Sequence, residues 1–135
     1  MVKRILIATL ATSVTGFGVG FLIMGVLLAE PMKEMYEAAA SCLLTEPAMV
    51  YIVIANIVIA LLFVILFTRM NVNTFKAGLW NGAWITFLMI VWFDVWMFAS
   101  FDFMQFKIMV LDVIGNTVIG TVAGGVAGWV LGKIK

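Results

Sequence analysis

The chain has 135 residues, a formal net charge of +1 at pH 7, and no histidine. Hydrophobic residues make up 65% of it and charged residues 11%, and its mean hydropathy is +1.21. This length is that of one domain, and this composition predicts an integral membrane protein. Without histidine the usual axial ligand of haem and the commonest ligand of transition metals are missing, so we expect no metal, no cofactor and no Ser-His hydrolase.

Four segments are long and apolar enough to span a bilayer, which takes roughly 20 apolar residues as a helix. They cover residues 5–29, 48–68, 77–100 and 108–131. The first segment follows Lys3 and Arg4 as a signal peptide would, but it has no small-x-small cleavage site before charged residues, so we expect it to be retained. The predicted fold is an all-α, antiparallel bundle of four transmembrane helices in one domain, residues 1–135.

Charged residues distinguish the two sides of this bundle. One side carries these cations: Lys3, Arg4, Arg69, Lys76, Lys133 and Lys135. The other side carries only Lys33 and Lys107 as cations, so the positive-inside rule places both termini in the cytoplasm. The asymmetry orients the protein in the lipid bilayer, and we expect no nucleic-acid partner.

The first predicted helix is rich in small residues, and Gly16 and Gly20 form a GxxxG pair that lets helix backbones approach. After it, apolar residues recur at helical spacing over residues 32–43, and Pro31 suits a first helical position. We predict a short amphipathic helix on the outer surface of the membrane, with an irregular loop as the alternative. Cys42, at its end, is either a small loop residue or the partner in an intermolecular disulfide.

The second predicted helix is apolar throughout except for Asn56, which we expect to hydrogen-bond to a neighbouring helix. The residues Thr45-Glu46-Pro47 have the pattern of a cap and first turn for this helix. The turn that follows it, residues 69–75, is short, and Thr74 fits an N-cap for the third helix. The second and third helices should therefore form an antiparallel pair.

Tryptophans form a ridge on the third predicted helix. The ridge, at i+4 spacing, consists of Trp80, Trp84, Leu88, Trp92 and Trp96. We interpret it as a lipid-facing or packing ridge rather than a ligand-stacking surface. Asp94 lies two residues after Trp92, about 200° round the helix. If the ridge faces lipid, Asp94 faces the interior of the bundle.

The fourth predicted helix repeats small or polar residues at every fourth position. This row, the glycine ridge, consists of Asp112, Asn116, Gly120, Gly124, Gly128 and Gly132. Such a row favours a close right-handed helix crossing of the GxxxG type. We expect the glycine-rich first helix to be its partner within the chain, and a second protomer is the alternative.

Polar side chains from three helices fall in the outer half of the predicted membrane. At 1.5 Å per residue, Asp94 lies roughly 7 Å and Asp112 about 12 Å outward from the midplane. Asn56 and Asn116 lie on the same side of the midplane, so these four residues predict an outer-facing polar pocket with Glu30 at its mouth. The two carboxyl groups either relay protons or, protonated or hydrogen-bonded, fix the register of the helices.

Motifs for enzymatic chemistry are missing from the sequence. Intramembrane aspartyl proteases also use two membrane carboxylates, but they carry Gly-x-Gly-Asp, whereas Trp92-Phe93 precede Asp94 and Val110-Leu111 precede Asp112. The sequence contains no P-loop, dinucleotide fingerprint or metal-ligand cluster. We therefore expect a protein that is not an enzyme.

Several short segments along the chain together carry a resemblance to known proteins. They are Lys3-Arg4-Ile5-Leu6-Ile7-Ala8-Thr9-Leu10, Thr45-Glu46-Pro47, Thr74-Phe75-Lys76-Ala77-Gly78-Leu79, Phe93-Asp94, Leu111-Asp112-Val113 and Gly128-Trp129-Val130-Leu131-Gly132-Lys133. Through them the whole chain resembles a family of small bacterial four-helix membrane proteins, common in Bacteroidetes-type bacteria and of unknown function. The resemblance implies a bacterial inner-membrane four-helix fold and brings no activity with it.

Two functions are compatible with these patterns. The glycine ridge favours a non-enzymatic packing or assembly protein, either a homo-oligomer or an accessory subunit of a larger membrane complex. The pair Asp94 and Asp112 favours a small carrier or channel for protons, ions or a solute. Carboxyl groups close to each other and beside a cavity would favour transport, whereas carboxyl groups bonded separately to neighbouring helices would favour packing.

Overall fold

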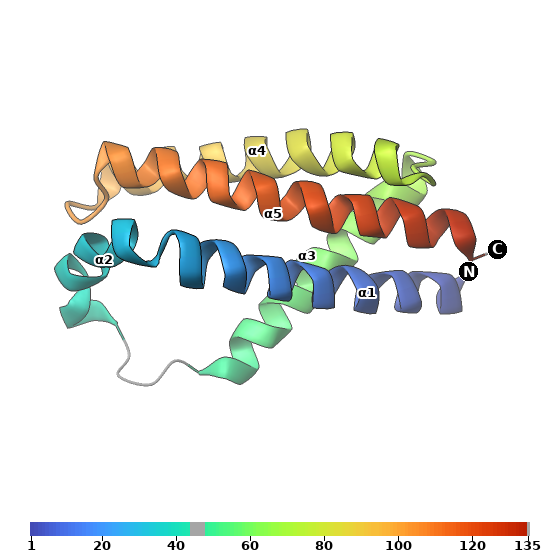
Figure 1. Ribbon diagram of the computed structural model, residues 1–135, viewed down its shortest axis with the longest axis horizontal. Helices are drawn as coiled ribbons and strands as arrows, with labels where there is room; N and C mark the ends of the chain where they lie inside the picture. Colours follow the sequence, from blue (N-terminus) through green and yellow to red (C-terminus); the bar gives the residue numbers. More distant parts are fainter. Residues whose placement is uncertain (44–47, 135) are drawn as a thin grey trace.

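The computed structural model describes residues 1–43 and 48–134, and every element in these ranges is helical (Figure 1). The long helices are α1 (Val2–Gly20), α3 (Met49–Arg69), α4 (Phe75–Ser100) and α5 (Phe106–Lys133). A π-helical turn, η1 (Phe21–Leu27), joins α1 to the short helix α2 (Ala29–Ala38), which is followed by a 3-10 turn, η2 (Ala40–Cys42). The predicted all-α fold, with a short helix between the first and second long ones, is confirmed.

Four helical stretches are long and apolar enough to cross a membrane, counting α1 and η1 as one stretch from Val2 to Leu27. The protein is therefore a multi-pass membrane protein that contacts the lipid bilayer. Both termini lie at one end of the molecule together with the α3–α4 turn, which we call the terminus end (Figure 1). Helix α2 and the α4–α5 loop lie at the opposite end, the loop end.

The turn between α3 and α4 follows from its sequence. Asn71 adopts a φ of 56°, and Asn is one of the few residues other than glycine that readily accept this left-handed conformation. Thr74 then caps α4, because its side-chain oxygen accepts a hydrogen bond from the backbone N–H of Ala77 at 3.2 Å. The predicted Thr74 cap is confirmed, while the predicted cap at Thr45-Glu46-Pro47 lies outside the described residues.

Helix α2 begins three residues earlier than the periodicity predicts. The π-helical turn closes with the N–H of Leu28 donating to the carbonyl of Ile23 at 2.8 Å, and α2 starts at the next residue. Pro31 therefore lies inside the first turn, where its missing N–H leaves no helical hydrogen bond unmade. Met32 is buried against the bundle, while Glu34 is exposed, so the helix is amphipathic as expected.

Two apolar clusters form the core, one toward each end. The cluster toward the terminus end consists of Ala8, Phe63, Val64, Phe67, Val72, Ile85, Ala127, Val130 and Leu131. At the loop end, Met32, Met104 and Ile108 are buried and further methionines pack around them. We call this second group the methionine cluster: Met24, Met32, Met35, Met97, Met104 and Met109.

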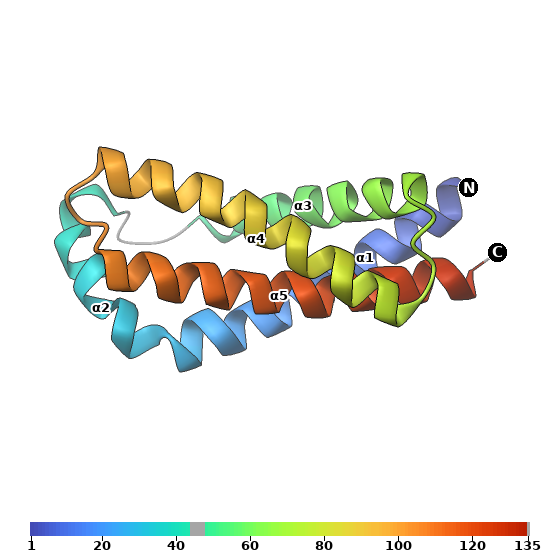
Figure 2. The same ribbon diagram turned by 90° about the horizontal axis from the view of Figure 1, so that it is seen from above.

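The glycine ridge of α5 packs against α4, and these two helices make the most extensive contact in the described chain (Figure 2). A Cβ atom added to Gly124 would lie 2.6 Å from the carbonyl oxygen of Gly78 and 2.8 Å from the Cα of Gly82. The two backbones therefore touch, which only glycine permits. The prediction that the first helix is the partner of this ridge is wrong.

The reason lies in a second GxxxG pair, Gly78 and Gly82, which gives α4 a bare surface in register with the ridge. On α1, by contrast, a Cβ added to Gly20 would lie 3.8 Å from a methyl group of Ile119, an ordinary side-chain contact. Gly16 has a similar environment, 3.6 Å from the side-chain oxygen of Asn56. Helix α1 thus packs against side chains, and α4 packs against backbone.

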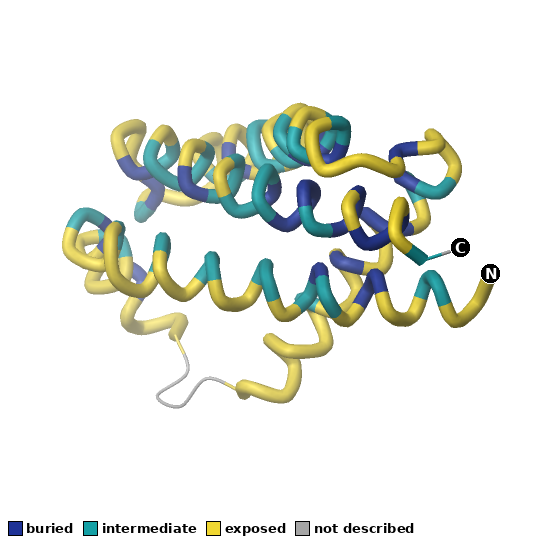
Figure 3. Tube along the Cα trace, turned by 45° about the vertical axis from the view of Figure 1, so that its right-hand side comes forward, coloured by how far each residue is buried: buried dark blue, intermediate teal, exposed yellow. Residues whose placement is uncertain are grey.

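Helix α3 packs on the other helices mainly through its second half, where Phe63, Val64 and Phe67 are buried. It contacts α1 and, less extensively, α5, and has no extensive contact with α4 in the part of the chain that the structure describes. Its first half leans away from the other helices, and residues 49–55 are all exposed (Figures 1 and 3). Side chains of α3 and α4 instead line opposite parts of a pocket, to which α1 and α5 also contribute.

Candidate functional site

Asp94 lies on the side of α4 that faces the bundle. Its side chain is 1% exposed, whereas Trp80 and Trp92 of the tryptophan ridge are 75% and 74% exposed. The ridge therefore faces outward and Asp94 inward, as the sequence predicts. The glycine contact explains this orientation, because Asp94 belongs to the same i+4 row of α4 as the two bare positions. That row is Gly78, Gly82, Thr86, Ile90 and Asp94.

The antiparallel rows of α4 and α5 bring Asp94 next to Asp112. The two carboxyl groups are direct neighbours. Asn116 completes the group, because its side-chain Nδ2 donates to Oδ2 of Asp112 at 2.9 Å and to the backbone carbonyl of Asp112 at 3.1 Å. Asp94 and Asp112, which we call the acidic pair, thus span the contact between two transmembrane helices.

A hydrogen bond within the acidic pair requires a particular protonation state. An ionised carboxylate only accepts hydrogen bonds, so two carboxyl groups bond to each other only when one carries a proton. Oδ2 of Asp94 is buried and has no hydrogen-bond partner in the structure, and the donor that Asp112 finds is the neutral amide of Asn116. The arrangement can therefore hold one proton between two oxygen atoms.

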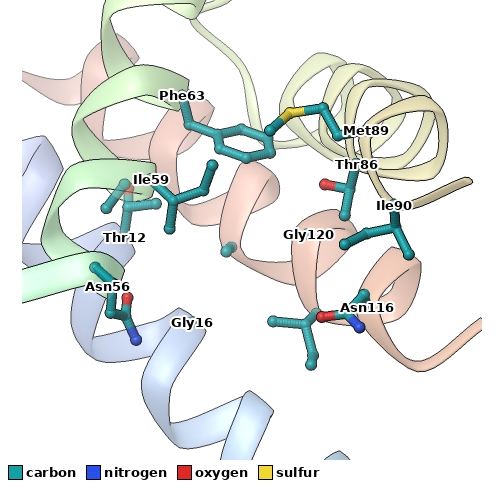
Figure 4. A pocket seen from close by; sticks show the side chains of 14 residues that line it. Thr12, Gly16, Asn56, Ile59, Phe63, Thr86, Met89, Ile90, Asn116 and Gly120 are labelled. Carbon is teal, nitrogen blue, oxygen red and sulfur yellow. The ribbon is translucent and has the colours of Figure 1, made fainter. Parts of the chain in front are cut away.

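A cavity of about 330 Å³ lies beside this pair, among α1, α3, α4 and α5 (Figure 4). Most of its wall is apolar, and its polar side chains are Thr12, Asn56, Thr86 and Asn116. Asn116 is shared, because it lines the cavity and also donates to Asp112. It is therefore the link between the carboxyl groups and the cavity.

The structure divides the predicted polar pocket into three parts. Asp94, Asp112 and Asn116 are together, and Asn56 lies across the cavity from Asn116 (Figure 4). Asn56 has its own partner on a neighbouring helix, since its Oδ1 accepts a hydrogen bond from the Ser13 hydroxyl at 3.4 Å. Glu30 is exposed on α2 and does not line the cavity.

Two residues of the site were missed by sequence reasoning, Thr12 and Thr86. Both line the cavity, and the side-chain oxygen of each is buried without a hydrogen-bond partner. The available signal was spacing: Thr12 precedes Gly16 by four residues, and Thr86 follows Gly82 by four. Each therefore continues an inward-facing row of its helix.

Comparison with known proteins gives no match, whether to a family model, to a curated protein or to a solved structure. The resemblance to a bacterial four-helix family therefore stays a prediction.

Proposed function

We propose that the protein is a small membrane carrier in which Asp94 and Asp112 take up and release protons. The observation that carries this proposal is the contact between two carboxyl groups inside transmembrane segments, with a cavity one side chain away. Carboxyl groups at membrane depth are costly, about 2.5–3.5 kcal/mol each on insertion scales when charged, and they commonly mark proton or ion pathways. The proposal assigns no enzymatic reaction to the protein.

A purely structural role for the pair is less well supported. The glycine contact already holds α4 against α5 over several turns, so the two helices do not require an acidic pair to associate. One oxygen of Asp94 is buried without a hydrogen-bond partner among the described residues, so fixed donors of the protein do not fully satisfy this carboxyl group. A buried polar group without a partner calls for an explanation, and a proton taken up and released at this position is the one we propose.

The charge distribution supports a direction for the carrier. The terminus end carries most of the cations, so by the positive-inside rule we place it in the cytoplasm of a bacterial inner membrane. Asp112 is the seventh residue of α5, about 9 Å from the start of that helix at the loop end. The acidic pair would then exchange protons more readily with the outer side of the membrane.

Proton flux into vesicles tests the proposal. The purified protein is reconstituted into liposomes with a pH-sensitive dye inside, and an outward potassium gradient with valinomycin drives proton entry. D94N and D112N retain hydrogen bonding but hold no titrating proton, so each should reduce the flux to that of protein-free vesicles. The matched control is D102N, in the exposed α4–α5 loop, which should leave the flux unchanged.

Two results would contradict the carrier. Flux that persists in the D94N/D112N double variant would remove the acidic pair from the pathway. Flux through the unaltered protein no greater than through protein-free vesicles would remove the activity itself. Thermal unfolding of each variant in detergent shows whether a loss of flux reflects a loss of fold.

A second candidate function, a non-enzymatic assembly protein or accessory subunit, is favoured by the exposed first half of α3. Tyr51 and Val58 are 74% and 60% exposed on a helix that leans away from its neighbours. The glycine ridge, which first suggested a partner, is covered by α4 and leaves no bare surface for another chain. A partner, whether a second copy or another membrane protein, would therefore contact α3.

Native mass spectrometry in mild detergent tests this second function. A homo-oligomer would appear as a multiple of the 14.8 kDa chain and should dissociate in a V58W variant. The control is W80A, on the exposed ridge of α4, which should not change the oligomer. A single-chain mass for the unaltered protein at all concentrations would exclude self-assembly.

A further inference from the structure

We infer that the cavity among α1, α3, α4 and α5 binds a neutral, lipid-soluble molecule whose head carries carbonyl or hydroxyl oxygens. This chemistry is shared by quinone-type rings and by the glycerol esters of uncharged lipids. The inference concerns binding only and does not depend on proton transport by the acidic pair.

The size and composition of the cavity are those of a small-molecule site. Its volume of about 330 Å³ lies at the lower end of the range for ligand pockets. Such pockets combine an apolar wall with a few convergent polar groups, and here four helices each contribute one polar side chain (Figure 4). A cavity of this size accommodates a ring or a short polar head but not a whole helix.

The polar groups of the cavity are incompletely satisfied. Thr12 is only 2% exposed, and its hydroxyl has no hydrogen-bond partner among the residues that the structure describes. The hydroxyl of Thr86 is also buried without a partner. Buried hydroxyl groups are normally hydrogen-bonded, so two orphans in one cavity indicate a missing partner. Separate polar groups of a ligand, one toward α1 and one toward α4, would satisfy them.

The hydrogen bonds already made define which atoms are free for a ligand. Asn56 accepts from Ser13 through Oδ1, which leaves the N–H groups of its amide as donors toward the cavity. Asn116 donates to Asp112 through Nδ2, which leaves its Oδ1 as an acceptor. The free groups therefore offer both donors and acceptors, as a head with carbonyl or hydroxyl oxygens requires.

The charge of the ligand follows from the lining. None of the described residues that form the cavity wall is Lys, Arg, Asp or Glu, so a charged head would lose its hydration without gaining a counter-ion there. An anion would in addition approach the acidic pair behind Asn116. Both considerations select an uncharged head.

The route of entry points to the lipid phase. The cavity lies where α3 and α4 lack an extensive contact, and Ile59 of α3 and Met89 of α4 line it while remaining 37% and 38% exposed. These apolar side chains form a rim that faces the surrounding membrane. A ligand would therefore enter sideways from the bilayer, which requires it to be lipid-soluble.

Binding to the purified full-length protein in detergent tests the inference by isothermal titration. Three probes distinguish the sources: a short-chain benzoquinone, a short-chain diacylglycerol, and a fatty acid of matched length as the charged comparison. We expect one of the two neutral probes to bind with one-to-one stoichiometry and the fatty acid not to bind. The neutral probe that binds identifies the source of the ligand.

Threonine-to-valine variants make the test specific, because they remove one hydroxyl and preserve side-chain shape. T12V and T86V should each weaken binding about fivefold to tenfold, the usual loss for one neutral hydrogen bond. The matched control is T15V on α1, whose hydroxyl donates to the carbonyl of Ala11 and does not line the cavity, and it should bind like the unaltered protein.

A variant that fills the cavity provides a second, independent measurement. Ala55 lines the cavity from α3 and is itself exposed, so A55F should abolish binding without disturbing a packed core. The inference is overturned if neither neutral probe binds, if the fatty acid binds equally well, or if T12V and T86V bind like T15V. The first result would mean that no such ligand binds, the second that the cavity does not select an uncharged head, and the third that the two hydroxyls do not contact the ligand.

Discussion

Replacing Gly124 by alanine should destabilise the protein, although alanine is the better helix former. The added Cβ would lie 2.6 Å from the carbonyl oxygen of Gly78 and 2.8 Å from the Cα of Gly82, both well inside the 3.0 Å that real Cβ atoms essentially never cross. Both neighbours are backbone atoms and cannot rotate away. Relief therefore requires α4 and α5 to separate along their length.

The magnitude follows from two opposing effects. Alanine gains up to about 1 kcal/mol over glycine inside a helix. Overpacking a close contact costs typically about 1–3 kcal/mol, and backbone-on-backbone contact belongs at the upper end of that range because nothing nearby can repack. We therefore expect G124A to lower the free energy of unfolding by about 2 kcal/mol.

Reversible unfolding in mixed micelles, followed by circular dichroism as the denaturing detergent increases, measures this change. The matched control is G18A on α1, where an added Cβ meets nothing within 4 Å. That variant should be neutral or more stable, by up to about 1 kcal/mol. If G124A proves as stable as G18A, the close contact between α4 and α5 is not as described and the reasoning fails.

The same assay checks three further predictions. T74A removes the cap that accepts from Ala77 and should cost about 1 kcal/mol, whereas an unchanged stability would show that the cap is replaced by solvent. T12V removes a buried hydroxyl without a partner and should leave stability unchanged or raise it by up to about 1 kcal/mol, while a clear loss would reveal a bound water or ligand. R4M removes the hydrogen bond that Arg4 donates to the carbonyl of Leu131, which connects α1 to the end of α5. It should lower the free energy of unfolding by about 1–2 kcal/mol, and an unchanged stability would contradict this expectation.

The long helices could be predicted because they depend on local properties. Apolar length identifies each span, and side-chain periodicity identifies the outward face of α4, where Trp92 is 74% exposed. The Thr74 cap depends only on its own turn. Such features need no knowledge of what lies beside the helix.

The partner of the glycine ridge could not be chosen in the same way. A bare surface such as Gly120 to Gly132 shows that some backbone approaches closely, but it does not say which helix supplies that backbone. Helix α1 has more glycines, yet α4 has two, Gly78 and Gly82, at the spacing and height that match. The register of α4 along α5 determines which glycines meet, and this register is set only when all four helices are packed together.

The candidate site also has one part that the sequence predicts and another part that depends on how the helices pack. Depth along the helices placed Asp94 and Asp112 at comparable heights, and the structure brings these two side chains together. The position of Asn56 depends on the angle at which α3 crosses α1, which no residue count provides, and it lies across the cavity from Asn116. The two unpaired threonine hydroxyls become visible only when burial and partners are known.

Because the methionine cluster lies at the loop end, the two ends of the molecule differ in their sensitivity to oxidation. Oxidation turns a thioether into a polar sulfoxide, which a packed apolar cluster does not tolerate. Met32, which packs α2 against the bundle, is only 4% exposed, whereas most of the methionines around it are partly exposed and are oxidised before it. Their oxidation would disrupt the packing around Met32 and loosen α2. The contact between α4 and α5 is built from glycine backbone and contains no thioether to oxidise, so it would outlast the contact of α2.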